Sequence, residues 1–393
     1  MKAEVYLSGG LRTPIGSYCG VFSKVSAIAL GSSIVKAVVQ GTGIKSECID
    51  EIIMGNVLGA GLGPNVARSV GLGAGLNPEV GATTIGKVCG SGLKSVMAAA
   101  QAIQCEDAEV VVAGGVENMT GAPYLLEKAR TGYRMGNGEI IDAMLRDGLW
   151  DPFSDQHMGM LGEECARKYA FSRQDQDTFA IESYERARKA LADGSFKDEV
   201  SPVEITSRKG TQVISEDEEP GRYNPEKFLA LRPAFGKEGS ITAGNASSIS
   251  DGAAALLVTS AKQTETLGLK PQARIAGYTT ASINPKWFTI APVQAIQKLL
   301  DQLSWKASDV DLFEINEAFA VVPMAVIKDL DLPREKVNIH GGAIAIGHPI
   351  GASGSRILVT LMHALEKRKA RRGIASLCIG GGEAVAMAVE RLT

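Results

Sequence analysis

The sequence predicts a duplicated, layered α/β fold that carries one large inserted loop domain. A strand that ends in Asn occurs at 49–56 and again at 310–316, and each is followed by a glycine-rich turn, a reactive residue and a helix. Strands also alternate with helices in both halves, which is typical of a mixed or parallel sheet covered by helices. We expect an N-terminal half over 1–119, an inserted domain over 120–250 that includes the return of the chain to the N-terminal half, and a C-terminal half over 251–393.

The two glycine-rich turns hold equivalent places in the two halves. Cys89 lies 33 residues after Asn56, and His348 lies 32 residues after Asn316. Repeated spacing of this kind indicates two copies of one supersecondary plan. Equivalent loops of a duplicated chain meet where the halves meet, so we expect Cys89 and His348 to converge.

The elements after each turn follow the same order in both halves. We expect helices over 93–103 and 352–365, and then a buried strand that runs into glycines, over 110–115 in the first half and 375–381 in the second. These runs of Val, Ala, Ile and Leu read as buried strands of a sheet that is covered on both faces.

The inserted domain has a different composition from the two halves, with more charge, Met and Pro. A long amphipathic helix is expected over 172–192, and Ser172 with Asp175 resembles a capping box at its start. Insertions of this size usually bind substrate. We expect the insertion to lie over the N-terminal half.

Composition excludes several classes of protein. A net charge of −3 argues against a general affinity for nucleic acid, and no apolar run is long enough for a signal peptide or for a helix that crosses a membrane. The six cysteines include no C-x-x-C pair. This pattern fits a reduced, cytoplasmic setting and predicts neither a metal site nor a disulfide scaffold.

Cys89 is a candidate nucleophile. It precedes a helix, and the exposed N–H groups and dipole of a helix start lower the pKa of a thiol and can stabilise an oxyanion. Gly90 and Gly92 leave the backbone free to bend sharply beside it. The alternative is that Cys89 is a small buried apolar residue, the usual role of a free cysteine.

His348 and Cys378 are the other candidates for chemistry. His348 lies among glycines before a helix, where it can approach a ligand and act as a base near neutral pH. Its alternative is a structural histidine bonded to backbone. Cys378 ends a strand before three glycines, and by itself it is more typical of packing. The convergence of all three residues is far more specific than any one of them.

These stretches together resemble the thiolase family, and within it the short-chain biosynthetic members, over essentially the whole chain. The matching segments are RTPIG at 12–16, VCGSG at 88–92, GGVENM at 114–119, HMG at 157–159, LRPAF at 231–235, TAGNAS at 242–247, NEAFA at 316–320, GGAIAIGHPIGASG at 341–354 and CIGGG at 378–382. The resemblance implies layers in the order α-β-α-β-α.

The resemblance also implies catalytic roles. Cys89 would attack an acyl thioester after His348 takes its proton, and Cys378 would remove a proton from the methyl carbon of a second acetyl-CoA. His348 and a water held by Asn316 would form one oxyanion hole. The backbone N–H groups of Cys89 and Gly380 would form the other. The expected activity is a ping-pong acetyl-CoA C-acetyltransferase that makes acetoacetyl-CoA and CoA.

The same resemblance implies a tunnel for coenzyme A and its pantetheine arm, with no cofactor, no metal and a homotetrameric assembly. The residues expected to line the tunnel are His157, Leu231, Phe235, Ala243, Ser247, Ala318 and Phe319. Apolar walls with a few polar anchors suit such a ligand. Ordinary core packing is the alternative for Ala243, Ala318 and Phe319.

Three positions depart from the usual family pattern. His340 stands where the family commonly has Asn, Phe288 stands where it commonly has Met, and Glu383-Ala384 follows the triple glycine where a Gly is common at the second place. Phe288 is expected to line the acyl pocket. Glu383 either perturbs Cys378 or faces away from it.

Three other functions compete with a short-chain acetyltransferase. A degradative 3-ketoacyl-CoA thiolase would accept longer chains, and Phe288 leaves this open. A decarboxylating ketoacyl synthase would use a second His or Asn in place of Cys378. A non-catalytic acyl-CoA or lipid carrier on the same fold is disfavoured by the intact set of Cys89, His348, Cys378 and Asn316.

Overall fold

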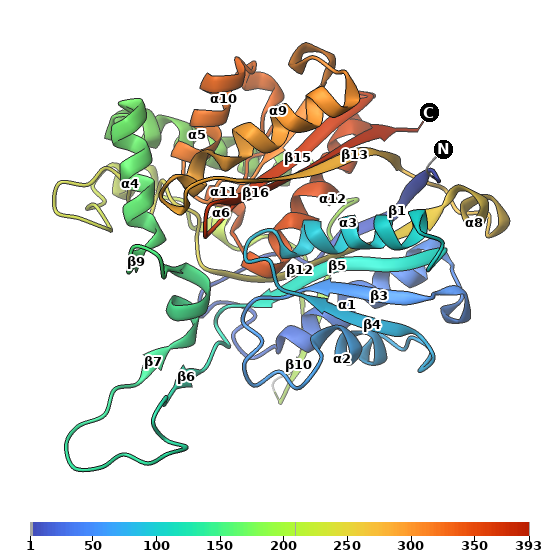
Figure 1. The fold of residues 1–393 in the computed structure, drawn as a ribbon, viewed down its shortest axis with the longest axis horizontal. Coiled ribbons are helices and arrows are strands. Elements are labelled where there is room, and N and C mark those ends of the chain that lie inside the picture. The colour runs from blue at the N-terminus through green and yellow to red at the C-terminus, as the bar shows by residue number, and fades with distance from the viewer. Residues whose placement is uncertain (1–2, 209, 393) are drawn as a thin grey trace.

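The structure is a computed structural model that describes residues 3–208 and 210–392, and it consists of five alternating layers of helices and strands (Figure 1). An outer layer contains α9 (Ala291–Leu303) and α10 (Val321–Leu330), and the opposite outer layer contains α1 (Ala27–Thr42) and α2 (Val66–Gly73). The central layer holds α3 (Ser91–Gln104) and α12 (Ile350–Arg368) between two sheets. The expected α-β-α-β-α order is confirmed.

The two sheets follow the same plan. The N-terminal sheet has the strand order β4 (Gly81–Ile85), β3 (Glu51–Gly55), β5 (Val110–Asn118), β12 (Ser250–Ser260) and β1 (Val5–Arg12). The C-terminal sheet has the order β14 (Leu312–Ile315), β15 (Arg372–Ile379), β16 (Glu383–Arg391) and β13 (Ala273–Ser282). In both sheets the strand that ends before the Asn of the repeat pairs in parallel with the strand that follows the central helix. These pairs are β3 with β5 and β14 with β15.

The expected duplication extends to single hydrogen bonds. The Asp50 carboxylate accepts the backbone N–H groups of Glu109 and Val110, each at 2.8 Å, directly before β5. The Asp311 carboxylate accepts the corresponding N–H groups of Arg371 and Arg372, also at 2.8 Å, before β15. The sheets are joined where β1 and β13 pair over two residues at their ends.

The N-terminal parts of α3 and α12 cross with their backbones in contact. A Cβ added to Gly354 would lie 2.3 Å from the backbone nitrogen of Leu93, and one added to Gly92 would lie 2.8 Å from that of Ser355. Only glycine fits at such a distance. This crossing brings the start of α3, which carries Cys89, beside the start of α12, which carries His348.

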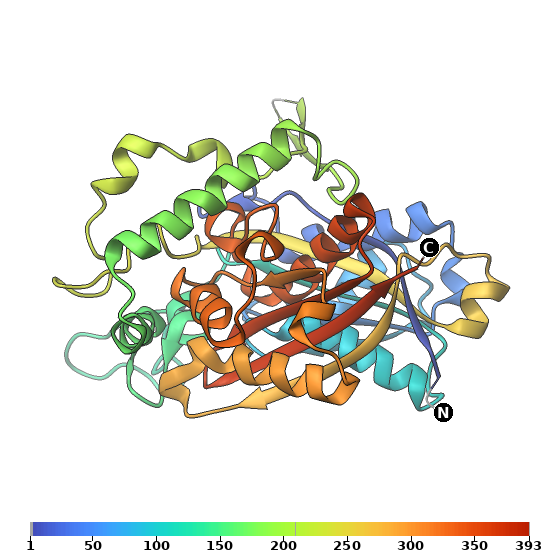
Figure 2. The same cartoon turned by 90° about the horizontal axis from the view of Figure 1, so that it is seen from above.

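The insertion rests on both halves, and the expectation that it lies over the N-terminal half is corrected. Helix α4 (Met158–Tyr169) packs on α10 and on a 3-10 helix at Pro285–Ile290, and α5 (Arg173–Ala192) packs on α11 (Ala343–Ile346). Figure 2 shows α5 running along one side of the molecule. The capping box of Ser172 and Asp175 is confirmed. The buried faces of these helices meet apolar surface that belongs to the C-terminal half.

The strand β12 returns the chain from the insertion to the N-terminal sheet, where it pairs with β5 and β1. It spans Ser250–Ser260, although the expected C-terminal half begins at 251. A sequence pattern identifies such a strand without indicating which sheet it joins.

The remaining elements are short and belong mostly to the insertion. They are β2 (Gly16–Ser17), β6 (Tyr124–Leu125), β7 (Ile141–Asp142), a π-helix at Met144–Leu149, β8 (Trp150–Asp151), β9 (Gln156–His157), β10 (Val203–Ser207), β11 (Gly210–Ile214), α6 (Glu219–Arg222), α7 (Pro225–Leu229), α8 (Ala261–Thr266), and 3-10 helices at Ser46–Cys48, Ala307–Asp309 and Arg334–Lys336. The segment of β6 and β7 protrudes as an arm (Figure 1). Within the described residues no helix has the length and apolar character needed to cross a membrane.

Candidate active site

Cys89 sits in a tight turn directly before α3. Val88 has a φ of +45°, a conformation that is unfavourable for a β-branched side chain. The N–H of Gly90 donates to the carbonyl of Lys87 at 3.0 Å, and the Ser91 hydroxyl donates to the carbonyl of Val88 at 2.7 Å. These bonds close the turn around Cys89, whose side chain is buried.

Burial dominates the electrostatics of Cys89. It raises the pKa of the thiol to about 11, against the lowering effect of the backbone N–H groups of Gly380 and of Cys89 itself. The expected lowering of the Cys89 pKa is therefore wrong, because desolvation penalises the thiolate more than these two N–H groups favour it. Cys89 rests as a thiol and needs a base. The backbone N–H groups of Cys89 and Gly380 lie close enough to the thiol to favour its charged form.

His348 lies in the equivalent turn before α12, and its tautomer follows from its partners. The Ser353 hydroxyl donates to the carbonyl of Pro349 at 2.9 Å, so its oxygen accepts the proton on Nδ1 of His348 at 2.6 Å. Nε2 of His348 is then left with its lone pair. Gly347 has a φ of +118°, and a Cβ there would lie 2.4 Å from Oγ of Ser250.

His348 is held neutral by its surroundings. Burial, with a smaller contribution from the nearby Arg356 guanidinium, lowers its pKa to about 3. Nδ2 of Asn316 lies 3.4 Å from Nε2 of His348, while the buried Oδ1 of Asn316 has no hydrogen-bond partner among the described residues. A neutral imidazole beside an unpaired amide oxygen fits a base next to a site for a polar group or water.

Cys378 is the second-to-last residue of β15 and is fully buried. The pKa of Cys378 is raised well above its ordinary value. Burial is the main cause, and the charge of Cys89 is the second. A thiol with so high a pKa becomes a strong base once it loses its proton. The structure thus places Cys89, Cys378 and the N–H of Gly380 together.

Glu117 links the two halves at this site, a role that was not predicted from the sequence. Its buried carboxylate accepts the N–H groups of Val57 and Leu58, the side-chain amide of Asn56 and the N–H of Gly351, at 2.8 to 3.1 Å. Burial nonetheless raises the pKa of Glu117 to about 7. It joins the loop after β3 to the first turn of α12. Its donors are distant in the sequence, so no local pattern indicates this role.

Several residues expected to bind substrate form one apolar cluster with Cys378. Its buried members include Met158, Phe288, Ala318 and Phe319, and Phe235 packs against it. His157 stacks on Phe235 with ring centroids 4.6 Å apart, and Phe235 meets the edge of Phe319 at 6.1 Å. These rings extend from the half-buried His157 to the buried cluster around Cys378.

Leu231 and Ala243 lie apart from this cluster. They line a cavity of about 190 Å³ whose charged lining residues are Arg222, Lys227 and Glu219. Ser247 is half-buried beside the apolar cluster, because both its N–H and its hydroxyl donate to the carbonyl of Ala318 at 3.0 Å. The two basic residues were not found by sequence reasoning, because single charges in a charged insertion resemble ordinary surface residues.

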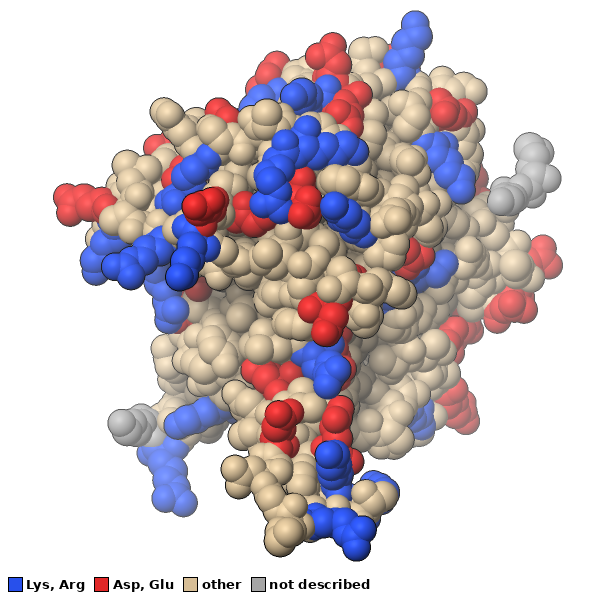
Figure 3. Space-filling view, turned by 60° about the vertical axis from the view of Figure 1, so that its left-hand side comes forward, with Lys and Arg blue, Asp and Glu red and all other residues tan. Residues whose placement is uncertain are grey.

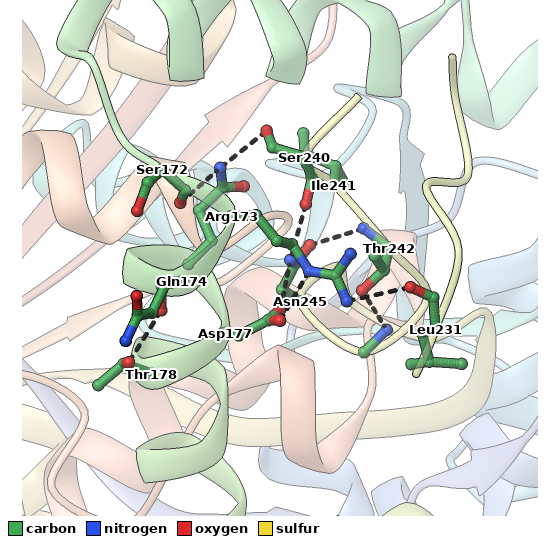
Figure 4. A network of polar contacts seen from close by, with 12 residues as sticks. Ser172, Arg173, Gln174, Asp177, Thr178, Leu231, Ser240, Ile241, Thr242 and Asn245 are labelled. Carbon is green, nitrogen blue, oxygen red and sulfur yellow. Dashed lines mark hydrogen bonds and ion pairs between the residues drawn. The ribbon is translucent and has the colours of Figure 1, made fainter. Parts of the chain in front are cut away.

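Polar contacts hold the segment 231–247 against α5 (Figure 4). The Arg173 guanidinium donates to Asp177 at 2.6 Å and to the carbonyl of Leu231 at 3.1 Å. The side-chain amide of Asn245 donates to the same Asp177 at 2.8 Å. The loop that carries Leu231, Ala243 and Ser247 is thereby fixed to a long helix.

Two of the unusual positions have defined surroundings. His340 meets the edge of Phe196 at 5.8 Å between ring centroids, and burial lowers its pKa. Glu383 does not point to Cys378, since its carboxylate accepts a 2.6 Å ion-pair contact from Lys87.

Comparisons with known proteins agree with this geometry. The sequence matches the family "Thiolase, N-terminal domain" over 5–262 and "Thiolase, C-terminal domain" over 269–391. It is 50% identical to an acetyl-CoA acetyltransferase of Escherichia coli over all of both chains, and 47% identical to one of Pseudomonas aeruginosa over 99% of each.

Solved structures are similar as well. A Bacillus anthracis acetyl-CoA acetyltransferase superimposes with a TM-score of 0.97 at 42% identity, covering 100% of this chain and 99% of the other. A thiolase of Ascaris suum in complex with coenzyme A gives 0.94 at 43% identity, covering 99% and 100%.

Proposed function

This chain belongs to the thiolase family, and from that premise we propose that it is an acetyl-CoA C-acetyltransferase, which joins two acetyl-CoA molecules into acetoacetyl-CoA and CoA. One observation supports the proposal above the others. A buried thiol, Cys89, has two backbone N–H donors beside it, while the neutral His348 stands at the equivalent turn with an unprotonated Nε2 that faces Asn316. That combination suits acyl transfer to sulfur.

In the first half-reaction, Nε2 of His348 takes the thiol proton of Cys89 as Sγ attacks the acetyl carbon. The C–S bond to CoA breaks, and the leaving CoA thiolate takes the proton of Cys378. The products are acetyl-Cys89, CoA, a protonated His348 and a Cys378 thiolate. The N–H groups of Cys89 and Gly380 stabilise the negative oxygen that forms during the attack.

In the second half-reaction, the Cys378 thiolate removes a proton from the methyl carbon of a second acetyl-CoA. Protonated His348, with a water held at the unpaired Oδ1 of Asn316, stabilises the enolate. The carbanion attacks acetyl-Cys89, a C–C bond forms, and the Cys89 thiolate takes back the proton from His348. Every group returns to its initial state, so the enzyme needs no cofactor or metal.

Coenzyme A is the expected partner of the binding surfaces. The apolar cluster and the rings of His157, Phe235 and Phe319 suit the pantetheine arm. Lys227 beside Leu231 suits a phosphate group, while Arg222 in the same cavity is paired with Glu218. A degradative 3-ketoacyl-CoA thiolase remains the second candidate, because Phe288 belongs to the apolar cluster around Cys378 and its shape bears on chain length.

The proposal is tested by thiolysis of acetoacetyl-CoA and of 3-ketoacyl-CoA thioesters of increasing length. We expect activity confined to four- and five-carbon substrates, abolished in Cys89→Ala. Cys105→Ala is the matched control, since Cys105 is an exposed free cysteine at the other end of the same helix. Strong activity on long chains would favour the degradative function. Absence of any cleavage, with no acetyl group on Cys89 by intact-protein mass, would favour a non-catalytic carrier.

We further propose a homotetramer located in the cytoplasm. The protruding arm carries exposed apolar side chains, among them Tyr124, Leu126, Met135 and Ile140. Lys or Arg side chains lie at its tip, and Asp or Glu side chains lie nearer the body of the molecule (Figure 3). Strand β4 is an exposed sheet edge. Both features suit contacts between copies. A monomer mass from light scattering would contradict the tetramer.

The metal-free mechanism has its own test. Loss of activity after dialysis against a chelator would contradict it.

A further inference from the structure

We infer that the Lys87–Glu383 ion pair is a positioning device that holds the turn of Cys89 against the loop of Gly380, so that the Gly380 N–H stays on the sulfur of Cys89. The inference rests on the proposed function, since it concerns the oxyanion site of that reaction. Neither residue touches the reacting atoms, so both are positioning residues.

The two loops meet through three contacts. Nζ of Lys87 lies 2.6 Å from Oε2 of Glu383. The Gly380 N–H lies near enough to the Cys89 sulfur to favour its charged form, and a Cβ added to Gly380 would lie 3.9 Å from Cγ1 of Val88. A Cβ added to Gly90 would lie 2.4 Å from Cδ1 of Ile379, so the backbone there fits closely against that side chain. The two loops therefore run antiparallel, because Lys87 lies opposite Glu383, Cys89 opposite Gly380 and Gly90 opposite Ile379.

The ion pair is the contact that joins the two loops at their outer end. Lys87 begins the turn of Cys89, and its carbonyl accepts the N–H of Gly90. Glu383 follows Gly381 and Gly382, whose φ angles are +93° and +91°. Glycines in such conformations have little intrinsic stiffness. An anchor after them therefore restricts where the Gly380 N–H points.

The local charges make the pair interdependent. The side chains of Lys87 and Glu383 are 18% and 34% exposed, so the pair is partly shielded from solvent. Lys87 also lies near the like charge of Lys94. Burial is the main cause that lowers the pKa of Lys94, and the charge of Lys87 is the second cause. The hydroxyl of Ser282 donates to the other carboxylate oxygen of Glu383 at 3.3 Å. Loss of Glu383 would leave two lysines without this counter-charge.

Whether the two variants change the alkylation rate of Cys89 in the same or in opposite directions distinguishes a positioning role from a through-space charge effect. A positive charge near a thiol favours the thiolate and a negative charge disfavours it. If Lys87 and Glu383 acted only by charge, Lys87→Met would slow alkylation of Cys89 and Glu383→Gln would accelerate it. If they act by holding the loops together, both variants slow alkylation, because both loosen the Gly380 donor.

The experiment measures alkylation of Cys89 by iodoacetamide, located by peptide mass, together with kcat and KM for thiolysis of acetoacetyl-CoA. We expect each single variant to lower kcat and the alkylation rate by roughly three- to tenfold, with KM little changed. The double variant should be no worse than either single one, and the reversed pair Lys87→Glu with Glu383→Lys should recover most of the loss.

Lys262→Met is the matched control, because Lys262 forms a Lys–Glu contact with Glu109 at 3.4 Å on an exposed surface. It should leave both readouts unchanged. Opposite signs in the two single variants, wild-type rates in either, or additive losses in the double variant would overturn the inference. Alkylation needs no turnover, so an inactive wild-type enzyme with the expected alkylation pattern would refute the proposed function and leave the positioning role standing.

Discussion

The turn of Cys89 and the turn of His348 occupy equivalent places in a duplicated fold, yet they prepare their side chains in opposite ways. The first leaves a buried thiol protonated and surrounds its sulfur with backbone N–H donors. The second keeps an imidazole neutral and fixes its proton on Nδ1 through Ser353. The backbone plan is shared, and the difference in chemistry comes from a few side chains at the helix starts.

The strongest test of this contrast is His348→Gln, which keeps a polar side chain but removes the base. We expect kcat for thiolysis to fall by roughly 10²–10⁴-fold, because the thiol of Cys89 would have no acceptor for its proton. Steady-state kinetics with acetoacetyl-CoA measures the effect. A value of kcat within tenfold of wild type would mean that another group takes the proton and that the two turns do not act as a pair.

The crossing of α3 and α12 should be the next most sensitive feature. Gly354→Ala places a Cβ 2.3 Å from the backbone nitrogen of Leu93, so we expect a loss of about 1–3 kcal/mol in the free energy of unfolding, with reduced activity. Denaturant unfolding measures it. In Gly41→Ala, the control at an open site in α1, stability should rise slightly, since alanine favours a helix. Equal effects of both substitutions would show that the crossing is not tight.

The pH dependence of acylation tests the environment of His348. Because the pKa of His348 is lowered to about 3, the imidazole stays unprotonated as pH falls through its usual range, and acylation of Cys89 should hold down to roughly pH 5. The rate of acetyl transfer to Cys89, followed by intact-protein mass between pH 4.5 and 8, tests this. A half-maximal rate near pH 6.5 would show that the histidine is solvated and lacks the environment described.

The smallest effect is expected at the residues before the two reactive side chains. Val88 and Gly347 both have positive φ, but only the second is a glycine. Val88→Gly removes backbone strain and also removes apolar contact with the core, so the unfolding free energy should change by less than about 1 kcal/mol. Thermal unfolding measures the sum. A large loss would mean that the valine side chain itself shapes the turn.

Much of this architecture could be predicted from the sequence because it repeats. The paired spacings from Asn56 to Cys89 and from Asn316 to His348 indicate both turns and both central helices. The duplication alone therefore predicts that the reactive residues meet where the two halves join. Elements without a repeat, such as the insertion, could be located along the chain but not placed in space.

The parts that escaped prediction depend on burial and on distant partners. A helix start suggested a low pKa for Cys89, but a sequence does not indicate how deeply the thiol is desolvated. Glu117 and Glu383 were visible as residues, yet their partners Gly351 and Lys87 lie 234 and 296 positions away along the chain. Electrostatic roles of that kind require the folded arrangement.

The direct contact of the backbones of α3 and α12 also bears on how such a protein can change over time. The spacing of the thiol and the imidazole depends on two main chains at a glycine crossing, with no cushion of side chains between them. Mutations that remodel α4, α5 or the arm leave that spacing intact. Substrate preference can therefore change during evolution, or be re-engineered by grafting another insertion, while the reaction stays the same.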